Sequence, residues 1–267
     1  MPEITAALVK ELRDKTDAGM MDCKKALSET GGDIEKAVEY LRKTGVTKAE
    51  KKSGRSVKEG LIASFIDGNT GTLVEVLCET DFVAKNEKFR DFIKSLAKDA
   101  ASVTTDGDVG AQLKSIGNDR LTQMIAVIGE NMQIGRALKW KSQNGVCAAY
   151  LHMGGKIAVM IEAEGGKDTT ALNDVCMHIA AFSPKYVAPE NIPADIVAKE
   201  KEIAASQIGN KPPQILEKIL DGKLNKWFSE VCLMKQPWIR DDKVSTEKAN
   251  PGLKVKRFVR WQVGESC

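Results

Sequence analysis

The sequence of 267 residues has few of the side chains from which catalytic and metal sites are commonly built. It contains two histidines, His152 and His178, and its six cysteines lie singly, without a Cys-x-x-Cys pair. Scattered cysteines argue against zinc binding or thiol redox chemistry and are typical of buried, free thiols in a reducing cytoplasm. The sequence also lacks a phosphate-binding loop, a nucleophile elbow and a His-Glu-x-x-His pair. We therefore expect a binding protein rather than an enzyme, with no metal and no cofactor.

An excess of charge of one sign and long apolar runs are lacking as well. Lys and Arg number 40 and Asp and Glu number 37, which leaves a net charge of +3. This balance gives no reason to expect a nucleic-acid or membrane partner. The apolar stretches are too short to span a bilayer, and no secretory signal precedes the first expected helix. A cytoplasmic location is the expectation.

What the sequence does contain begins with a small helical module in residues 1–54. Apolar residues recur there at helical spacing, and Thr5 and Asp33 stand where they would cap the first and third of three short helices. The turn before the second helix carries Met20 and Met21. Adjacent methionines fit either a core filler or an adaptable contact surface, and both interpretations remain open.

A basic stretch follows the module. Residues 47–59 carry five Lys or Arg side chains and little apolar content, which predicts a solvated linker with a domain boundary near residue 55.

Beyond the linker the sequence repeats itself. A hairpin signature at 60–76 recurs at 145–161, and each copy is followed by a helix with an apolar stripe. The closing segments 132–140 and 253–261 also match, with Arg136 corresponding to Arg257. We predict an α+β fold in which two related lobes each combine a three-stranded antiparallel sheet with helices. The expected segments are 55–141 for the first lobe, and 142–192 with 233–267 for the second.

The second copy is interrupted by residues 193–232. Two amphipathic stretches flank a Pro-Pro turn there, which predicts an antiparallel helical hairpin inserted into the lobe. Its apolar positions allow two interpretations: the helices bury them against each other, or they bind a partner or a second copy of the chain.

Residues 80–86, Thr-Asp-Phe-Val-Ala-Lys-Asn, form the corner between an expected strand and an expected helix. A plain structural turn with Phe82 in the core is one interpretation. The internal repeat favours another, because the second copy has Gly165-Gly166 where the first has Asp81-Phe82. The fold therefore does not require Asp-Phe at this place, and we predict that Phe82 is exposed.

Several of these motifs together resemble the bacterial elongation factor Ts family. They are the front turn 18–27, the corner 80–86, the run Ile128-Gly-Glu-Asn131, the stretch Met177–Ala181 with Pro184, and the closing segment 257–260. The resemblance extends over essentially the whole chain. It implies a ubiquitin-associated-like three-helix module, a core of two lobes and an inserted helical hairpin.

The resemblance also implies a function: guanine-nucleotide exchange on the GTPase elongation factor Tu, without an active site in the exchange factor itself. A non-enzymatic adaptor that binds another protein through the three-helix module is the alternative. No direct contact with nucleic acid or membrane is implied, and self-association through the helical hairpin remains open.

By the family pattern, Thr80, Asp81, Phe82 and Val83 dislodge Mg²⁺ from the partner, with Phe82 as the wedge and Asp81 as a polar contact. Met20 and Met21 would dock on the partner's nucleotide domain, and His152 matches a contacting histidine of the family. Asp17 departs from the pattern, because the family usually has Gly there; Asp tolerates a left-handed backbone better than most residues.

Overall fold

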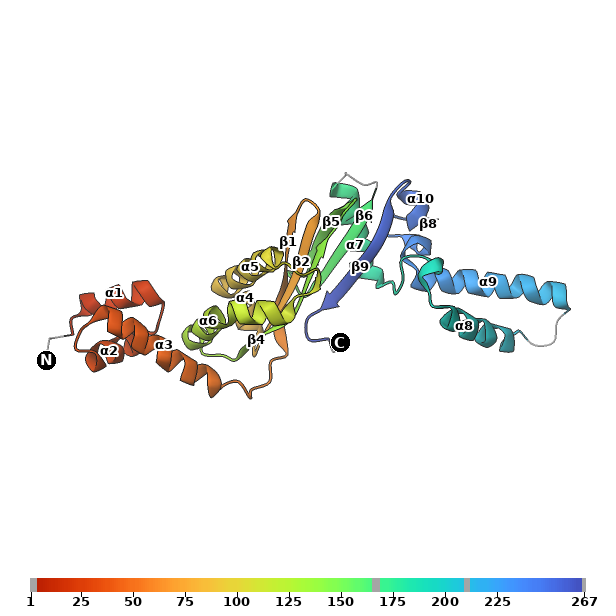
Figure 1. Ribbon diagram of the computed structural model, residues 1–267. Coiled ribbons are helices and arrows are strands. Elements are labelled where there is room, and N and C mark those ends of the chain that lie inside the picture. Colours follow the sequence, from red (N-terminus) through yellow and green to blue (C-terminus); the bar gives the residue numbers. More distant parts are fainter. Residues whose placement is uncertain (1–3, 165–168, 209–211, 266–267) are drawn as a thin grey trace. The chain divides into compact units, whose positions relative to one another are not determined.

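A computed structural model describes residues 4–164, 169–208 and 212–265 (Figure 1). The chain forms two compact units. Unit 1 comprises Met1–Ala63, Thr72–Lys139 and Val263–Cys267, and unit 2 comprises Ser64–Gly71 and Trp140–Gln262. The four segments expected from the sequence divide the chain more finely than this grouping, so their boundaries stay a prediction.

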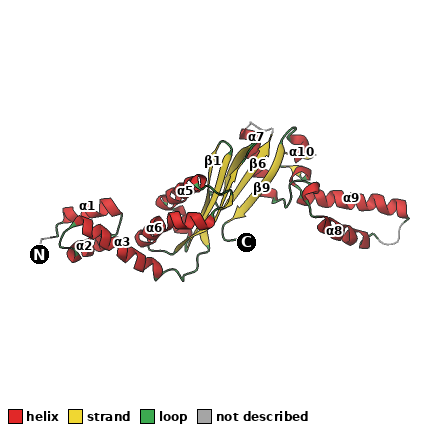
Figure 2. Cartoon of the chain, in the orientation of Figure 1, coloured by secondary structure: helices red, strands yellow, loops and turns green. Residues whose placement is uncertain are grey.

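Unit 1 contains the first six helices and most of one sheet (Figures 1 and 2). The elements are α1 Ala6–Thr16, α2 Met20–Glu29, α3 Ile34–Glu50, β1 Glu59–Asp67, β2 Thr70–Cys78, α4 Asp81–Lys85, α5 Glu87–Ser102, β3 Gly107–Asp108, α6 Gly110–Ile128 and β4 Met132–Lys141. Unit 2 continues with β5 Val146–His152, β6 Ile157–Glu164, α7 Thr169–Phe182, α8 Ala194–Ser206, α9 Pro213–Val231, β7 Pro237–Trp238, β8 Asp241–Ser245, α10 Thr246–Ala249 and β9 Lys254–Gln262, with short 3-10 turns at Pro189–Asn191 and Leu233–Lys235.

The front module forms as expected. Thr5 Oγ1 accepts the Leu8 N–H at 3.3 Å and Asp33 Oδ1 accepts the Lys36 N–H at 3.1 Å, so both predicted N-caps are confirmed. The three helices enclose a small apolar core made of Val9, Leu12, Cys23, Ala26, Leu27 and Ala37.

The expected linker is shorter than predicted. Helix α3 continues to Glu50, so residues 47–50 are helical and the connection to β1 begins only at residue 51. Tertiary contacts explain the extension. Lys48 Nζ lies 2.8 Å from Asp22 Oδ1 on α2, and Arg42 forms an ion pair with Asp119 on α6. Exposed ion pairs contribute little by themselves. The packing of α3 against α2 and α6, which these pairs accompany, therefore accounts for a helix that the local composition does not favour.

The sheet of unit 1 has the strand order β1-β2-β4-β3. The prediction of three strands is wrong for this lobe by one short strand, because Gly107–Asp108 pairs antiparallel with β4 at Leu138 and Lys139. Helices α5 and α6 pack beside each other against this sheet (Figure 1). Thr72 Oγ1 on β2 donates to the Ala97 carbonyl on α5 at 2.7 Å, which ties the helix to the strand.

The sheet of unit 2 has the predicted three strands, in the order β5-β6-β9, and both pairings are antiparallel. Helix α7 covers it with the predicted stripe of Leu172, Val175, Cys176 and Ile179, all of them buried. The α+β class with N-terminal helices and antiparallel sheets is therefore confirmed. The small β7–β8 ladder and helix α10 before the last strand were not predicted from the sequence.

The internal repeat is visible in matching contacts. In the first copy Arg136 on β4 binds Glu75 on β2 through two hydrogen bonds of 2.9 Å, and in the second copy Arg257 Nε donates to Glu162 Oε2 at 2.7 Å. The entrance to each hairpin is equally crowded. A Cβ at Gly60 would lie 2.3 Å from the Val76 carbonyl oxygen, and one at Gly145 would lie 2.3 Å from that of Ala163. The same close backbone approach thus requires glycine twice.

Helices α8 and α9 run side by side within unit 2 (Figure 2). Ala204 and Leu220 are buried, but Ile196, Ile203 and Ile215 keep between a third and a half of their surface exposed. The Gly209–Lys211 part of the expected Pro-Pro turn lies outside the described residues. The helices are present as predicted, and the choice between closure and association stays open.

The predicted free thiols are also confirmed where they are described. The described cysteines that are buried and form no disulfide are Cys23, Cys78, Cys147, Cys176 and Cys232. Burial raises the pKa of the Cys232 thiol to about 11, which keeps it protonated and unreactive at neutral pH. Cys267 lies outside the described residues.

His178, on α7, is fully buried. Its ring stacks on Phe182 and Trp238 with centroids 4.7 and 5.3 Å away. Gln236 donates its amide N–H to the Glu230 carbonyl at 2.9 Å, so its oxygen faces His178 Nε2, also at 2.9 Å. Nε2 therefore carries the proton, while Nδ1 is buried with no hydrogen-bond partner among the described residues.

We expect acid to destabilise unit 2 through His178. Burial lowers the pKa of His178 below its ordinary value of 6.5, although the contact with Gln236 opposes the shift. His178 therefore binds a proton more readily in the unfolded chain than in the folded protein. The stability that neutral His178 contributes is fully present above pH 6.5, and it is lost as pH falls toward the lower pKa of the folded protein. Within this window the free energy of unfolding should fall by at most about 1.4 kcal/mol per pH unit. Urea titrations at pH 7.0, 6.0 and 5.5 would measure it, and His178→Gln should flatten the dependence. If the free energy of unfolding of this variant depended on pH as steeply as that of the wild type, His178 would not be the group responsible.

Candidate partner-binding site

The corner 80–86 is a short helix rather than a simple turn. Helix α4 begins after Thr80, whose Oγ1 accepts the Val83 N–H at 3.4 Å, and it ends at Lys85, with Asn86 as its C-cap. Asn86 is also the N-cap of α5, because its Oδ1 accepts the Lys88 N–H at 2.9 Å. Two consecutive caps therefore fix the backbone on both sides of α4 and hold the corner rigidly.

Phe82 points away from the protein at this corner. Its side chain is 80% exposed, while the next two residues, Val83 and Ala84, are buried. The predicted exposure of Phe82 is confirmed. A large aromatic ring held in water on a doubly capped turn contributes little to the core, and it is available for contact with another molecule. The matching Gly165-Gly166 of the second copy lies outside the described residues.

The charged neighbours of Phe82 pair with each other. Asp81 Oδ2 lies 2.7 Å from Lys85 Nζ, and this ammonium is 6.0 Å from the centre of the Phe82 ring. The Asp81–Lys85 pair is largely exposed, so it contributes little to stability and can exchange partners at low cost.

Met20 and Met21 at the start of α2 are surface residues. They are 59% and 77% exposed, which excludes the interpretation as core filler. Both line a groove of about 660 Å³ on the front module, together with Ile4 and Val9 and with the basic side chains of Lys10, Arg13 and Lys24. Asp14 also lines the groove, so its lining combines apolar side chains with three basic residues and one acidic residue. Such a lining suits an amphipathic segment.

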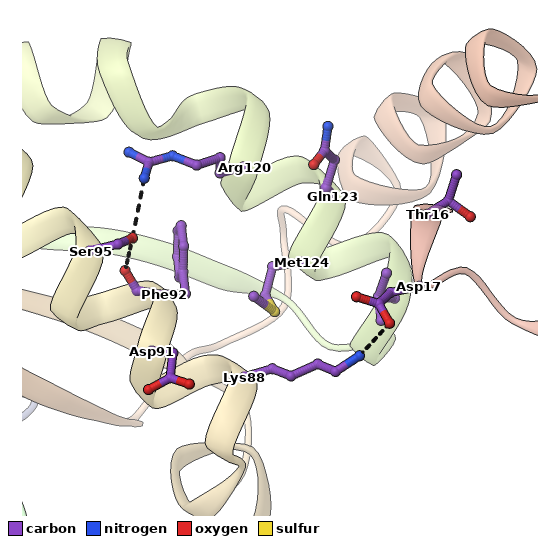
Figure 3. Close-up of a pocket in the computed structure, with 10 residues that line it drawn as sticks. Thr16, Asp17, Lys88, Asp91, Phe92, Ser95, Arg120, Gln123 and Met124 are labelled. Atoms are coloured by element: carbon purple, nitrogen blue, oxygen red, sulfur yellow. Dashed lines mark hydrogen bonds and ion pairs between the residues drawn. The ribbon is translucent and has the colours of Figure 1, made fainter. Parts of the chain in front are cut away.

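Asp17 has the left-handed backbone that the sequence indicated, with φ of 55°. Its carboxylate reaches Lys88 Nζ on α5 at 2.7 Å, a contact that a glycine would not make (Figure 3). The two residues border a pocket of about 350 Å³ between the end of α1 and helices α5 and α6, in which Arg120 donates to Ser95 Oγ (Figure 3). Polar contacts thus join the front module to the rest of unit 1.

His152 lies at the end of β5 in unit 2 and is exposed. Its Nδ1 is 3.2 Å from the Tyr150 hydroxyl, and the next residue, Met153, is 70% exposed with a left-handed φ of 49°. The hairpin tip therefore presents a histidine and a methionine together. The structure leaves the contact role of His152 a prediction.

Within the residues that the structure describes, no group of three or more His, Cys, Asp or Glu side chains is arranged to hold a metal ion. No helix in the described part of the chain is long and apolar enough to cross a membrane.

Sequence reasoning gave Glu130 no role at the corner. Glu130 Oε2 and Oε1 accept hydrogen bonds from the Thr80 N–H and the Thr80 hydroxyl at 3.0 and 2.7 Å. Fifty residues separate the two side chains, so no local pattern predicts the contact. The only sequence signal was the run Ile128-Gly-Glu-Asn131, which contributed to the family resemblance.

Comparisons with known proteins agree with this resemblance. The family model described as Elongation factor TS matches residues 79–265. An elongation factor Ts from Trichlorobacter lovleyi is 42% identical, in an alignment that covers 98% of this chain and 93% of the relative.

Proposed function

The chain belongs to the elongation factor Ts family of translation elongation factors, and from this premise we propose that it is the guanine-nucleotide exchange factor for elongation factor Tu. It acts in the cytoplasm by binding the GTPase and speeding the release of GDP. It has no active site of its own, and it needs no cofactor, nucleic acid or membrane for this activity.

The observation that carries the proposal is the exposed Phe82 on its capped corner. Faster release requires a lower barrier, and a ~10⁴-fold acceleration corresponds to about 5.5 kcal/mol. Full burial of a Phe side chain contributes roughly 1.5–3 kcal/mol, so one aromatic wedge supplies a sizeable part. Since Phe82 is exposed in the free protein, this burial energy is available on binding.

The remaining effect would come from the loss of Mg²⁺ in the partner. Mg²⁺ demands near-ideal octahedral coordination, so a small displacement of its ligands weakens its binding. Thr80, Asp81, Phe82 and Val83 form the segment that displaces it. For release to be favoured, the factor must bind the nucleotide-free GTPase more tightly than the GDP-bound form, and the two binding events are then coupled.

Other surfaces would add affinity to this contact. The groove beside Met20 and Met21 docks the front module on the nucleotide domain of the GTPase, and His152 with Met153 provides a contact from unit 2. The partly exposed isoleucines of α8 and α9 offer a surface for self-association.

The test is the release of a fluorescent GDP analogue from elongation factor Tu. One part of this protein to ten parts of GTPase should accelerate release many-fold and turn over repeatedly. An unchanged release rate would overturn the proposal. If residues 1–54 alone then captured a different helical or ubiquitin-like protein, an adaptor function would be favoured instead.

A further inference from the structure

The corner is held by residues that follow helix α6. Strands β2 and β4 are neighbours in the sheet, so the residues just after β2 lie against those just before β4. On the first side are Glu79 and Thr80, and on the other are Glu130 and Asn131. We refer to these four residues as the clasp.

The first half of the clasp joins Glu130 to Thr80. One carboxylate accepts both Thr80 donors, the N–H at 3.0 Å and the hydroxyl at 2.7 Å. The same hydroxyl oxygen caps α4 by accepting the Val83 N–H. Because the Thr80 hydroxyl donates its hydrogen bond to Glu130, the lone pairs of Thr80 Oγ1 are directed toward the helix. Hydrogen bonds to a charged acceptor are the stronger kind, so Glu130 fixes the residue from which the Phe82 helix begins.

In the second half of the clasp the donor lies on the side of β4 and the acceptor on the side of β2. Glu79 Oε1 accepts the Asn131 N–H at 2.6 Å. The Asn131 side-chain amide in turn donates to the carbonyls of Arg55 at 2.7 Å and Ser53 at 3.3 Å, in the connection between α3 and β1. Asn131 itself is 2% exposed, and its three hydrogen bonds are partly buried. The clasp therefore connects the Phe82 corner with the chain that leaves the front module.

The second copy of the repeat lacks the clasp. Continuing the match of the closing strands places Pro251 and Gly252 where the first copy has Glu130 and Asn131. Neither side chain accepts or donates a hydrogen bond. Nevertheless β9 pairs with β6 as β4 pairs with β2. The lobe folds without the clasp, so its presence in the first copy alone points to the corner that only this copy carries.

We propose that Glu130 is a positioning residue for nucleotide exchange: it orients Phe82 through Thr80, while Asn131 couples this orientation to the connection that follows the front module. The inference rests on the proposed exchange function. A wedge held in place loses little freedom on binding, so the clasp acts by preorganisation.

The test compares Glu130→Ala and Glu130→Gln in the full chain, with Glu39→Gln as the matched control. Glu39 is an exposed carboxylate in the middle of α3, and the control removes the same charge without touching the corner. We expect the maximal rate of GDP-analogue release to fall about tenfold for Glu130→Ala, as for a lost charged hydrogen bond. Glu130→Gln keeps one acceptor oxygen, so it should lose less, and Glu39→Gln should match the wild type.

A double-mutant cycle with Phe82→Ala separates positioning from general loss of structure. If Glu130 acts through Phe82, Glu130→Ala should reduce the rate less than twofold when Phe82 is already Ala. The inference would be overturned if the fold-reductions in release rate of the two single variants multiplied in the double variant. It would also be overturned if Phe82→Ala lowered the rate and Glu130→Ala did not.

Amide hydrogen exchange gives a readout that does not depend on the GTPase. The Val83 and Ala84 amides, which bond to Thr80, should exchange faster in Glu130→Ala than in the wild type. Unchanged protection would contradict the clasp. If the wild type failed to accelerate GDP release, the proposed nucleotide-exchange function would be wrong. Faster amide hydrogen exchange in Glu130→Ala would still support the clasp in that case.

Discussion

Phe82→Ala is expected to lower the acceleration of GDP release from elongation factor Tu by roughly 10–150-fold, because it removes about 1.5–3 kcal/mol of burial on binding. The side chain is 80% exposed in the free protein, so the free energy of unfolding should stay nearly unchanged. Stopped-flow release of a fluorescent GDP analogue measures the first quantity, and urea denaturation measures the second.

Two further variants make this result specific. Phe82→Leu restores much of the apolar volume and should recover part of the rate. Ile116→Ala removes another exposed apolar side chain, 52% accessible on α6, and should leave the rate unchanged. Equal losses for Phe82→Ala and Ile116→Ala would mean that general surface hydrophobicity, rather than a wedge, drives the exchange.

Arg136→Ala should destabilise unit 1 by about 3–5 kcal/mol, because it leaves the buried carboxylate of Glu75 without its bidentate partner. Glu75 is 3% exposed and the Arg136 side chain is 18% exposed, so water compensates poorly. The Gly264 N–H, 3.3 Å from Glu75 Oε1, is too weak a donor to replace the guanidinium. Urea denaturation followed by circular dichroism measures the loss.

The second copy of the repeat provides the matched control, Arg257→Ala. Burial raises the pKa of Glu162, but hydrogen bonding and the positive charges of Arg257 and Lys256 lower it overall. Lys256 lies 3.8 Å from the same carboxylate and would remain in the variant. We expect a smaller loss, about 1–2 kcal/mol, because the buried charge keeps one partner. A loss as large as that of Arg136→Ala would show that Lys256 does not compensate.

Most of the fold could be predicted because its elements have strong local signals. Thr5 and Asp33 capped the helices that they were expected to cap, and the two hairpins followed from alternating apolar residues. The predictions of the linker and of a three-stranded first sheet were wrong where contacts between distant residues determine the structure. Helix α3 extends into a basic stretch because it packs against α2 and α6, and β3 exists through its pairing with β4.

The candidate site was predictable only in part. The comparison between the two halves of the sequence indicated that the fold does not require Phe82 at the corner, which led to the correct expectation of exposure. The sequence did not predict helix α4, since five residues are too few for a periodic pattern. It also assigned no structural role to Glu130, whose partner lies fifty residues earlier in the chain.

By itself, the sequence determined the family, the fold class, the internal repeat and the identity of the corner, because these depend on residue types at fixed spacing. The tertiary structure decided that Phe82 projects into solvent from a capped helix and that Glu130 and Asn131 hold that helix in place. The contacts of Glu130 and Asn131 arise from the pairing of β2 with β4 in the sheet, which brings together side chains from distant parts of the chain.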